Sequence, residues 1–357
     1  MNQFANLSDE KCLNGILLGT AVGDSLGLPA EGLSARRIAK LFRGTWKQRF
    51  IFGRGMISDD TEHTVFVAQS LLTRSVDEFR NRLSWKLRLW LLTLPAGIGL
   101  ATLRSIMKLW LGFSPKRSGV FSAGNGAAMK SAIIGGYFAN EPDKINLYVE
   151  ACTRMTHTDP KALTGALAVA QLTGWIVRNQ DATGFAPNKI FSLLDKTGSD
   201  KEWQEILRKM QIGYANSYSV KEFAASMNLQ RAISGYVYHT VPMAIYSWMI
   251  HYGDFRKAVE SVLDCGGDTD TVAAIVGALS GATVGERGIP VEWFNRIRDY
   301  PFSTTYLRKL SDCLAKQRPD QRITKNKFLY HLIQTARNML FFAIVLTHII
   351  RRLAPPY

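Results

Sequence analysis

The sequence feature that most restricts the fold is a glycine at every fourth position of an apolar stretch. These glycines are Gly15, Gly19, Gly23 and Gly27. Inside a helix, each destabilises the structure by about 1 kcal/mol relative to alanine, so four of them require a compensating contact. A spacing of four places them in one stripe, where a second helix can approach closely. The same spacing recurs at Gly277, Gly281 and Gly285. We therefore expect both stretches to pack tightly in the core.

Two acidic segments, here called the acidic entrances, each begin an apolar helical stretch. They are Ser58–Thr61 and Asp264–Thr271. A carboxylate that caps a helix is common, so one such segment alone would mean little. Four carboxylates brought together would repel each other unless cations neutralised them. Oxygen ligands favour Mg²⁺ or Mn²⁺ over zinc. We expect the two acidic entrances to meet in space and to hold metal.

The hydrophobic pattern predicts an all-α protein, because no run alternates β-branched residues and no βαβ rhythm appears. Of the 357 residues, 46% are hydrophobic and 20% charged, which argues against wholesale disorder. The four cysteines are scattered without a CxxC pair, which argues against a zinc knuckle or a disulfide framework and fits a reducing compartment. The first ten residues lack the basic and apolar regions of a signal peptide. We expect a cytoplasmic protein.

The net charge of +15 is concentrated in two stretches, residues 74–117 and 308–357, which carry local excesses of seven and eight. Solvated surface is the default interpretation, and attraction to an anionic partner is the alternative. No zinc finger or aromatic-basic signature is present, so we expect no specific nucleic acid. The apolar segment 338–350 is short for a membrane span. We expect a buried terminal helix there rather than a membrane-contacting one.

A glycine-rich turn, Ser122–Lys130, is suited to phosphate because backbone N–H groups at the beginning of a helix bind anions. Many loops look like this, so the turn alone is a weak signal. His157 has two interpretations: a hydrogen-bonded loop histidine or a group that contacts a ligand.

Five segments together resemble the successive motifs of the ADP-ribosylglycohydrolase family. They are Gly19–Glu31, Ser58–Thr61, Gly124–Met129, Thr156–Pro160 and Gly266–Thr271. The resemblance covers about residues 12–285 and implies one compact all-α domain spanning residues 1–357, with a basic helical extension at 286–357. It also implies two Mg²⁺ or Mn²⁺ ions at the base of an ADP-ribose cleft. The chain departs from the family with Ser58 in place of the usual threonine, and with Lys130 and Lys161 in place of arginines.

The resemblance implies a role for each matching residue. Glu31 and Asp60 would be catalytic. The metal ligands would be Ser58, Asp59, Asp60, Asp268, Asp270 and Thr271. The substrate-binding residues would be Ser122, Gly124, Asn125 and His157. Carboxylate acid–base help of this kind resembles that of glycosidases.

The expected activity is metal-dependent removal of ADP-ribose from protein side chains, with arginine favoured over serine. The expected partners are ADP-ribose and an ADP-ribosylated protein, and we expect a monomer. Such a reaction could confer immunity against an ADP-ribosylating toxin. The alternative is a non-enzymatic protein that keeps the fold and either binds ADP-ribose or occludes a toxin.

Overall fold

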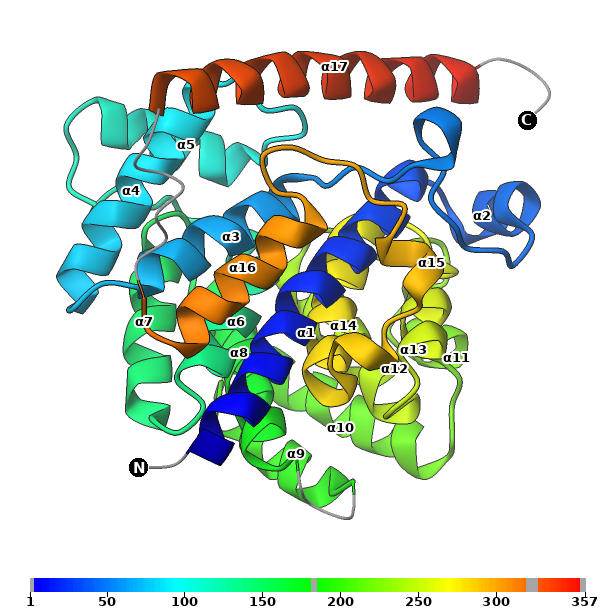
Figure 1. Cartoon of the computed structure of the whole chain (residues 1–357). Helices are drawn as coiled ribbons and strands as arrows, with labels where there is room; N and C mark the ends of the chain where they lie inside the picture. Colours follow the sequence, from blue (N-terminus) through cyan, green and yellow to red (C-terminus); the bar gives the residue numbers. More distant parts are fainter. Residues whose placement is uncertain (1–2, 181–184, 319–326, 354–357) are drawn as a thin grey trace.

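The structure, a computed structural model, describes residues 3–180, 185–318 and 327–353, and within these ranges it contains helices and no strands (Figure 1). The α-helices are α1 (Gln3–Gly27), α2 (Ala35–Phe42), α3 (Asp59–Leu71), α4 (Val76–Leu92), α5 (Leu100–Trp110), α6 (Ala132–Tyr137), α7 (Pro142–Arg154), α8 (Pro160–Arg178), α9 (Pro187–Asp195), α10 (Lys201–Ala215), α11 (Val220–Ser226), α12 (Val237–Ile250), α13 (Phe255–Leu263), α14 (Thr269–Val284), α15 (Val291–Phe294), α16 (Thr304–Ala315) and α17 (Lys327–Leu353). Short 3₁₀ helices are η1 (Leu28–Ala30), η2 (Ile51–Gly53), η3 (Asn125–Lys130) and η4 (Glu286–Gly288). The predicted all-α class is confirmed.

The two glycine stripes face each other, because α1 packs along α14 at the centre of the molecule (Figure 1). A methyl group added at Gly19 would lie 2.0 Å from the carbonyl oxygen of Gly277, and one added at Gly281 would lie 2.0 Å from that of Gly15. The expected tight packing is confirmed. The structure also shows that the two glycine stripes pack against each other. The helices run antiparallel, since Gly15 meets Gly281 whereas Gly27 meets Thr269.

This antiparallel contact determines where the candidate site forms. The Thr269 hydroxyl donates a hydrogen bond of 2.8 Å to the carbonyl oxygen of Gly27. The end of α1 and the beginning of α14 therefore lie together, and so do the residues just outside them. Helices α3, α6, α8, α12, α13 and α16 surround the central pair. One continuous apolar core results, and among its fully buried side chains are Trp90, Trp203, Trp248 and Trp293.

The terminal helix α17 lies across one side of the molecule, over α4 and α5 (Figure 1). Its inner face is buried through Gln334, Arg337, Asn338, Phe341 and Ile344. Its outer face exposes Leu332, Met339, Leu340, Phe342, Leu346 and Ile350. The expected buried terminal helix is therefore buried along one face only. The helical region 338–350 is apolar around most of its circumference, so sequence alone could not separate the two faces.

Across the described ranges, none of the helices, α17 included, combines the length and apolarity that crossing a membrane requires. The side chains of Arg351 and Arg352, as well as Pro355 and Pro356, lie outside the described residues.

Candidate functional site

Both acidic entrances reach one cavity of about 660 Å³. Nearly every residue predicted for the site lines it: Glu31, Ser58, Asp59, Ser122, Gly124, Asn125, His157, Asp268, Asp270 and Thr271. Asp60 does not line the cavity, because it is 1% exposed and lies behind the cavity wall. Residues from five distant parts of the sequence are thus brought to one place.

Asp60 joins the two acidic entrances. Its Oδ2 accepts hydrogen bonds of 3.2 Å from the Ser58 hydroxyl and from the Thr271 hydroxyl. Ser58 is also the N-cap of α3, where its hydroxyl accepts from the backbone N–H of Asp60. The other carboxylate oxygen, Oδ1, is buried and has no hydrogen-bond partner. Leaving a buried acceptor unsatisfied costs about 1–3 kcal/mol, so this oxygen is suited to a cation.

The second acidic entrance has its shape because of two adjacent glycines. Gly266 and Gly267 have φ angles of 71° and 92°, a region that residues with a side chain rarely adopt. A methyl group at Gly267 would lie 1.9 Å from the carbonyl oxygen of Ile233. The resulting turn is held by the Asp268 N–H, which donates to that same oxygen at 2.8 Å. Asp268 and Asp270 are thereby presented to the cavity at the beginning of α14.

Asn125 makes hydrogen bonds inside the site in addition to the substrate contact that was predicted for it. It was expected to contact the substrate, and it does line the cavity. Its side-chain amide also donates to Asp268 at 2.6 Å and to the Thr240 hydroxyl at 2.9 Å. Asn125 therefore orients Asp268, and the glycine-rich turn is tied directly to the second acidic entrance.

Asp24 contacts the first acidic entrance, and no sequence pattern singled it out as a candidate site residue. It is fully buried, and both carboxylate oxygens accept the backbone N–H of Ser58, at 2.9 and 3.0 Å. It also accepts from the backbone N–H and the hydroxyl of Thr61. Asp24 thus satisfies the free N–H groups at the beginning of α3 and fixes the first acidic entrance against α1. Its position on a glycine-striped helix was visible in the sequence, but its partners were not.

The environment of the aspartates in the two acidic entrances, and of Asp24, strongly disfavours their negatively charged form. Burial, followed by repulsion from neighbouring carboxylates, raises the pKa values of Asp59, Asp60 and Asp270 well above their ordinary value. Burial also raises the pKa of Asp24 to about 6, despite four opposing hydrogen bonds. Asp59 keeps some contact with solvent through the cavity. A bound cation would remove the repulsion.

The donor groups of this cluster are buried carboxylates, hydroxyls and the unpartnered Asp60 oxygen. Oxygen donors of this kind fit a hard divalent cation. Within the described residues, however, no group of three or more His, Cys, Asp or Glu side chains is arranged so that it could hold a metal ion. The predicted two-metal centre therefore stays a prediction.

The glycine-rich turn forms another part of the cavity wall. It continues as the 3₁₀ helix η3 before α6 begins, instead of entering one α-helix directly. The Ser122 hydroxyl accepts the Gly124 N–H at 3.2 Å. The His157 ring lies against the turn, since a methyl group at Gly126 would lie 3.1 Å from its Cε1. Burial and the nearby Lys130 lower the His157 pKa to about 3, so the ring is neutral at pH 7.

We expect the metal-free protein to lose stability as pH rises, and the trend is clearest above about pH 6.5, where the histidines no longer contribute. Because the aspartate pKa values are raised on folding, the folded state keeps protons that the unfolded state has already released. The stabilisation from these bound protons is fully present below about pH 4 and is lost as pH rises through the folded-state pKa values. Below about pH 6.5, the neutral buried His63 and His157 oppose this trend. Thermal unfolding in EDTA measures the slope. Adding Mn²⁺ should flatten it, and an unchanged slope would contradict the cation site.

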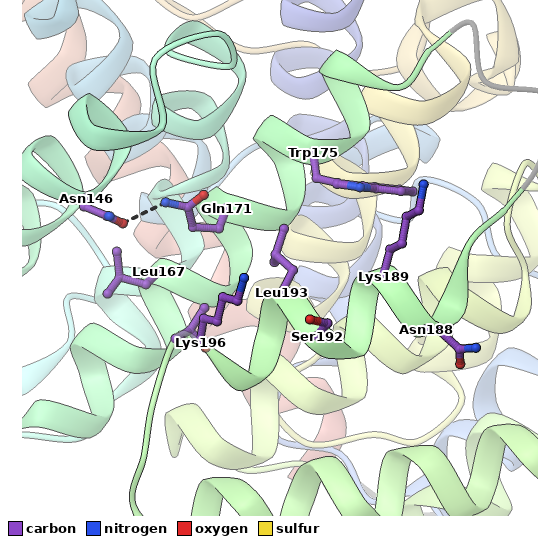
Figure 2. A pocket seen from close by; sticks show the side chains of 10 residues that line it. Asn146, Leu167, Gln171, Trp175, Asn188, Lys189, Ser192, Leu193 and Lys196 are labelled. Carbon is purple, nitrogen blue, oxygen red and sulfur yellow. Dashed lines mark hydrogen bonds between the residues drawn. The ribbon is translucent and has the colours of Figure 1, made fainter.

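A second cavity, of about 580 Å³, is lined by residues of α7, α8 and α9 (Figure 2). Asn146, Gln171, Trp175, Lys189 and Lys196 line it, and Gln171 donates to Asn146 at 2.7 Å. It contains no carboxylate and none of the predicted site residues. The acidic cavity is therefore the candidate site.

Comparison with known proteins agrees with this geometry. The sequence profile of the ADP-ribosylglycohydrolase family matches residues 8–324. An uncharacterized protein of Archaeoglobus fulgidus is 33% identical over 320 residues, which cover 85% of this chain and 96% of that protein. The ADP-ribosyl-[dinitrogen reductase] glycohydrolase of Rhodospirillum rubrum is 23% identical, covering 79% of this chain and 89% of its own length. The ADP-ribosylhydrolase ARH3 of Xenopus tropicalis is 25% identical, covering 85% and 95%.

A solved structure, described as an ADP-ribosylglycohydrolase-related protein complex, has the same fold. It superposes with a TM-score of 0.63 at 24% identity and covers 87% of this chain and 99% of that one. The matched profile spans most of the chain and contains both acidic entrances, the glycine-rich turn and His157. The chain belongs to the ADP-ribosylglycohydrolase family.

Proposed function

We propose that this protein hydrolyses the bond between ADP-ribose and a protein side chain, with arginine as the favoured acceptor. The observation that carries the proposal is that the two acidic entrances meet at Asp60, directly behind the wall of the cavity that their other residues line. Family membership supports the reaction class.

The cations would be held by Ser58, Asp59 and Asp60 from one entrance and by Asp268, Asp270 and Thr271 from the other. When bound, Mg²⁺ or Mn²⁺ supplies a positive field that polarises ribose oxygens and lowers the pKa of water. Asp24 and Asn125 would hold this set in place, because they fix Ser58 and Asp268 respectively.

Proton transfer is assigned to Glu31. It is exposed on the cavity wall directly after η1, whereas Asp60 is buried and accepts two hydroxyl hydrogen bonds. In hydrolysis, the water oxygen forms a bond to C1″ of the ribose while the bond from C1″ to the side chain breaks. Glu31 would take one proton from water and pass it to the leaving nitrogen of arginine, which restores the Glu31 carboxylate.

The glycine-rich turn would receive the diphosphate. Gly124 and Gly126 border the cavity without side chains, so backbone groups can approach an anion closely. His157 is neutral and buried against this turn, which suits a hydrogen bond to the ligand rather than an ion pair. Ser122 and Asn125 complete this wall.

The linkage can be tested directly. Proteins ADP-ribosylated on arginine or on serine are incubated with the full chain and Mg²⁺, and released ADP-ribose is quantified by mass spectrometry. We expect release from the arginine-linked substrate and a much slower release from the serine-linked one. The opposite ratio would overturn the arginine assignment. Tight binding of ADP-ribose without release from either would favour the non-enzymatic alternative. If a toxin made the modification, the same hydrolysis would confer immunity.

A further inference from the structure

The acidic cavity has an apolar wall to which none of the predicted site residues contributes. Phe341 and Val345 of α17 line it, together with Leu28 of η1 and Leu100 of α5. Leu28 and Phe341 also pack into one small apolar cluster with Phe50, Met56 and Ile344. Glu31 follows Leu28 closely in the chain and also lines the cavity. The apolar wall therefore borders the carboxylate to which proton transfer is assigned.

A buried ion pair fixes α17 against the first acidic entrance. Arg337 donates to both oxygens of Asp299, at 2.9 and 2.6 Å, and to the carbonyl oxygen of Ile57 at 2.5 Å. Asp299 in turn accepts the N–H of Ile57 at 3.0 Å. Ile57 directly precedes Ser58. The pair thus holds both backbone groups of the residue before the first predicted metal ligand.

Neighbouring contacts on the same face fix the rotation and register of the helix. Gln334 donates to Glu62 at 3.3 Å, one turn into α3. The Asn338 amide donates to the carbonyl oxygen and the hydroxyl of Thr93, both at 2.9 Å. Charge-assisted and buried hydrogen bonds of this kind are the stronger ones in proteins. Phe341, one turn after Arg337, is therefore held at the cavity as a fixed wall.

The chemistry of the wall limits what it can bind. The diphosphate and ribose of ADP-ribose are polar and suit the glycine-rich turn and the carboxylates. The wall formed by Leu28, Leu100, Phe341 and Val345 offers only apolar side chains. The family profile ends at residue 324, so α17 lies beyond the matched region. A segment outside that region thus completes the cavity beside Glu31.

We propose, building on the proposed function, that α17 forms an acceptor subsite, in which Phe341 and Val345 bind an apolar side chain next to the ADP-ribosylated residue of the protein substrate. Arg337 is a positioning residue for this subsite.

The test uses two peptides that carry ADP-ribosyl-arginine and differ only in a leucine or a glycine beside it. Binding to the full chain is measured by calorimetry in EDTA, so that affinity is read without turnover. We expect the leucine peptide to bind about ten-fold more tightly, the usual effect of filling a small apolar pocket. Phe341→Ala should remove most of this preference and leave the affinity for free ADP-ribose unchanged.

Phe342→Ala is the matched control, because Phe342 is the adjacent residue and lies 58% exposed on the outer face of α17. It should keep the preference. Val345→Ala is a milder change in the same wall, for use if Phe341→Ala unfolds. Arg337→Lys keeps the charge but loses the two-pronged contact with Asp299, and it should reduce the leucine preference more than the affinity for free ADP-ribose.

The subsite would be overturned if the wild-type protein bound the two peptides equally well, or if it bound neither of them. An equal loss of peptide and free ADP-ribose affinity in Phe341→Ala would also overturn it, because the wall would then hold adenine. The outcome is separable from that of the proposed function. A leucine preference without hydrolysis in Mg²⁺ would overturn the function alone, and hydrolysis without a preference would overturn the subsite alone.

Discussion

Replacing Asp60 with asparagine is expected to reduce the rate of ADP-ribose release by about 10²–10³-fold or more, the scale seen when one group that stabilises a transition state is removed. The substitution keeps the shape of the side chain and removes the charge that would bind a cation. Its amide can still donate to the hydroxyls of Ser58 and Thr271, which also accept hydrogen bonds. Asp268→Asn should behave similarly.

The protein should stay folded despite this loss. Burial and carboxylate repulsion raise the pKa of Asp60, so a neutral side chain relieves an unfavourable charge in the metal-free state. We expect Asp60→Asn in EDTA to unfold at the wild-type temperature or above it. Addition of Mn²⁺ should raise the wild-type unfolding temperature by a few degrees and that of the variant much less.

Asp254→Asn is the matched control for this experiment. Asp254 caps α13 and does not line the cavity, and asparagine caps helices about as well as aspartate. Its activity and its response to Mn²⁺ should equal those of the wild type. Full activity of Asp60→Asn, or an unchanged response to Mn²⁺, would contradict the role assigned to the acidic entrances.

Replacing Gly23 with alanine is expected to destabilise the fold by about 3 kcal/mol or more, at the upper end of overpacking effects. The added methyl group would lie 1.9 Å from the carbonyl oxygen of Ala273 and 2.8 Å from the backbone nitrogen of Ala274. These are backbone atoms of α14, so no side chain can turn away. Helices α1 and α14 would have to separate.

Urea denaturation followed by circular dichroism measures this effect as the free energy of unfolding. Gly99→Ala is the control, because a methyl group there meets nothing closer than 4.0 Å and Gly99 has ordinary helix-capping angles. Gly99→Ala should lower the free energy of unfolding by about 1 kcal/mol or less. If the Gly23 variant were equally mild, the close contact of α1 with α14 would be wrong.

The sequence predicted what depends on local pattern. Glycine spacing indicated close helix packing at Gly15–Gly27 and Gly277–Gly285, and helix-start chemistry singled out Asp59, Asp60, Asp268 and Asp270. These signals are local, because capping groups and periodicity act within a few residues. The structure brings the two patterns together, since the antiparallel stripes carry the beginning of α14 to the end of α1.

What the sequence did not predict depends on distant partners. Asp24 contacts Ser58 and Thr61 across more than thirty residues, and Asn125 reaches Asp268 across 143. Arg337 reaches Ile57 across 280. No local pattern distinguishes such side chains from other buried polar groups. The sequence predicted a buried terminal helix, whereas α17 is buried along one face only. The sequence of an apolar helix looks the same whether one face or both are covered.

We propose that the acidic entrances form a cation-dependent hydrolytic site. The most direct measurement is the rate of ADP-ribose release from an arginine-ADP-ribosylated protein by the full chain, first in Mg²⁺, then in EDTA, and then after Mg²⁺ is restored in excess. We predict release in Mg²⁺, its loss in EDTA and its recovery on restoration. Release that continues unchanged in EDTA, or that is absent in Mg²⁺ and also when Mn²⁺ replaces it, would contradict a cation-dependent site.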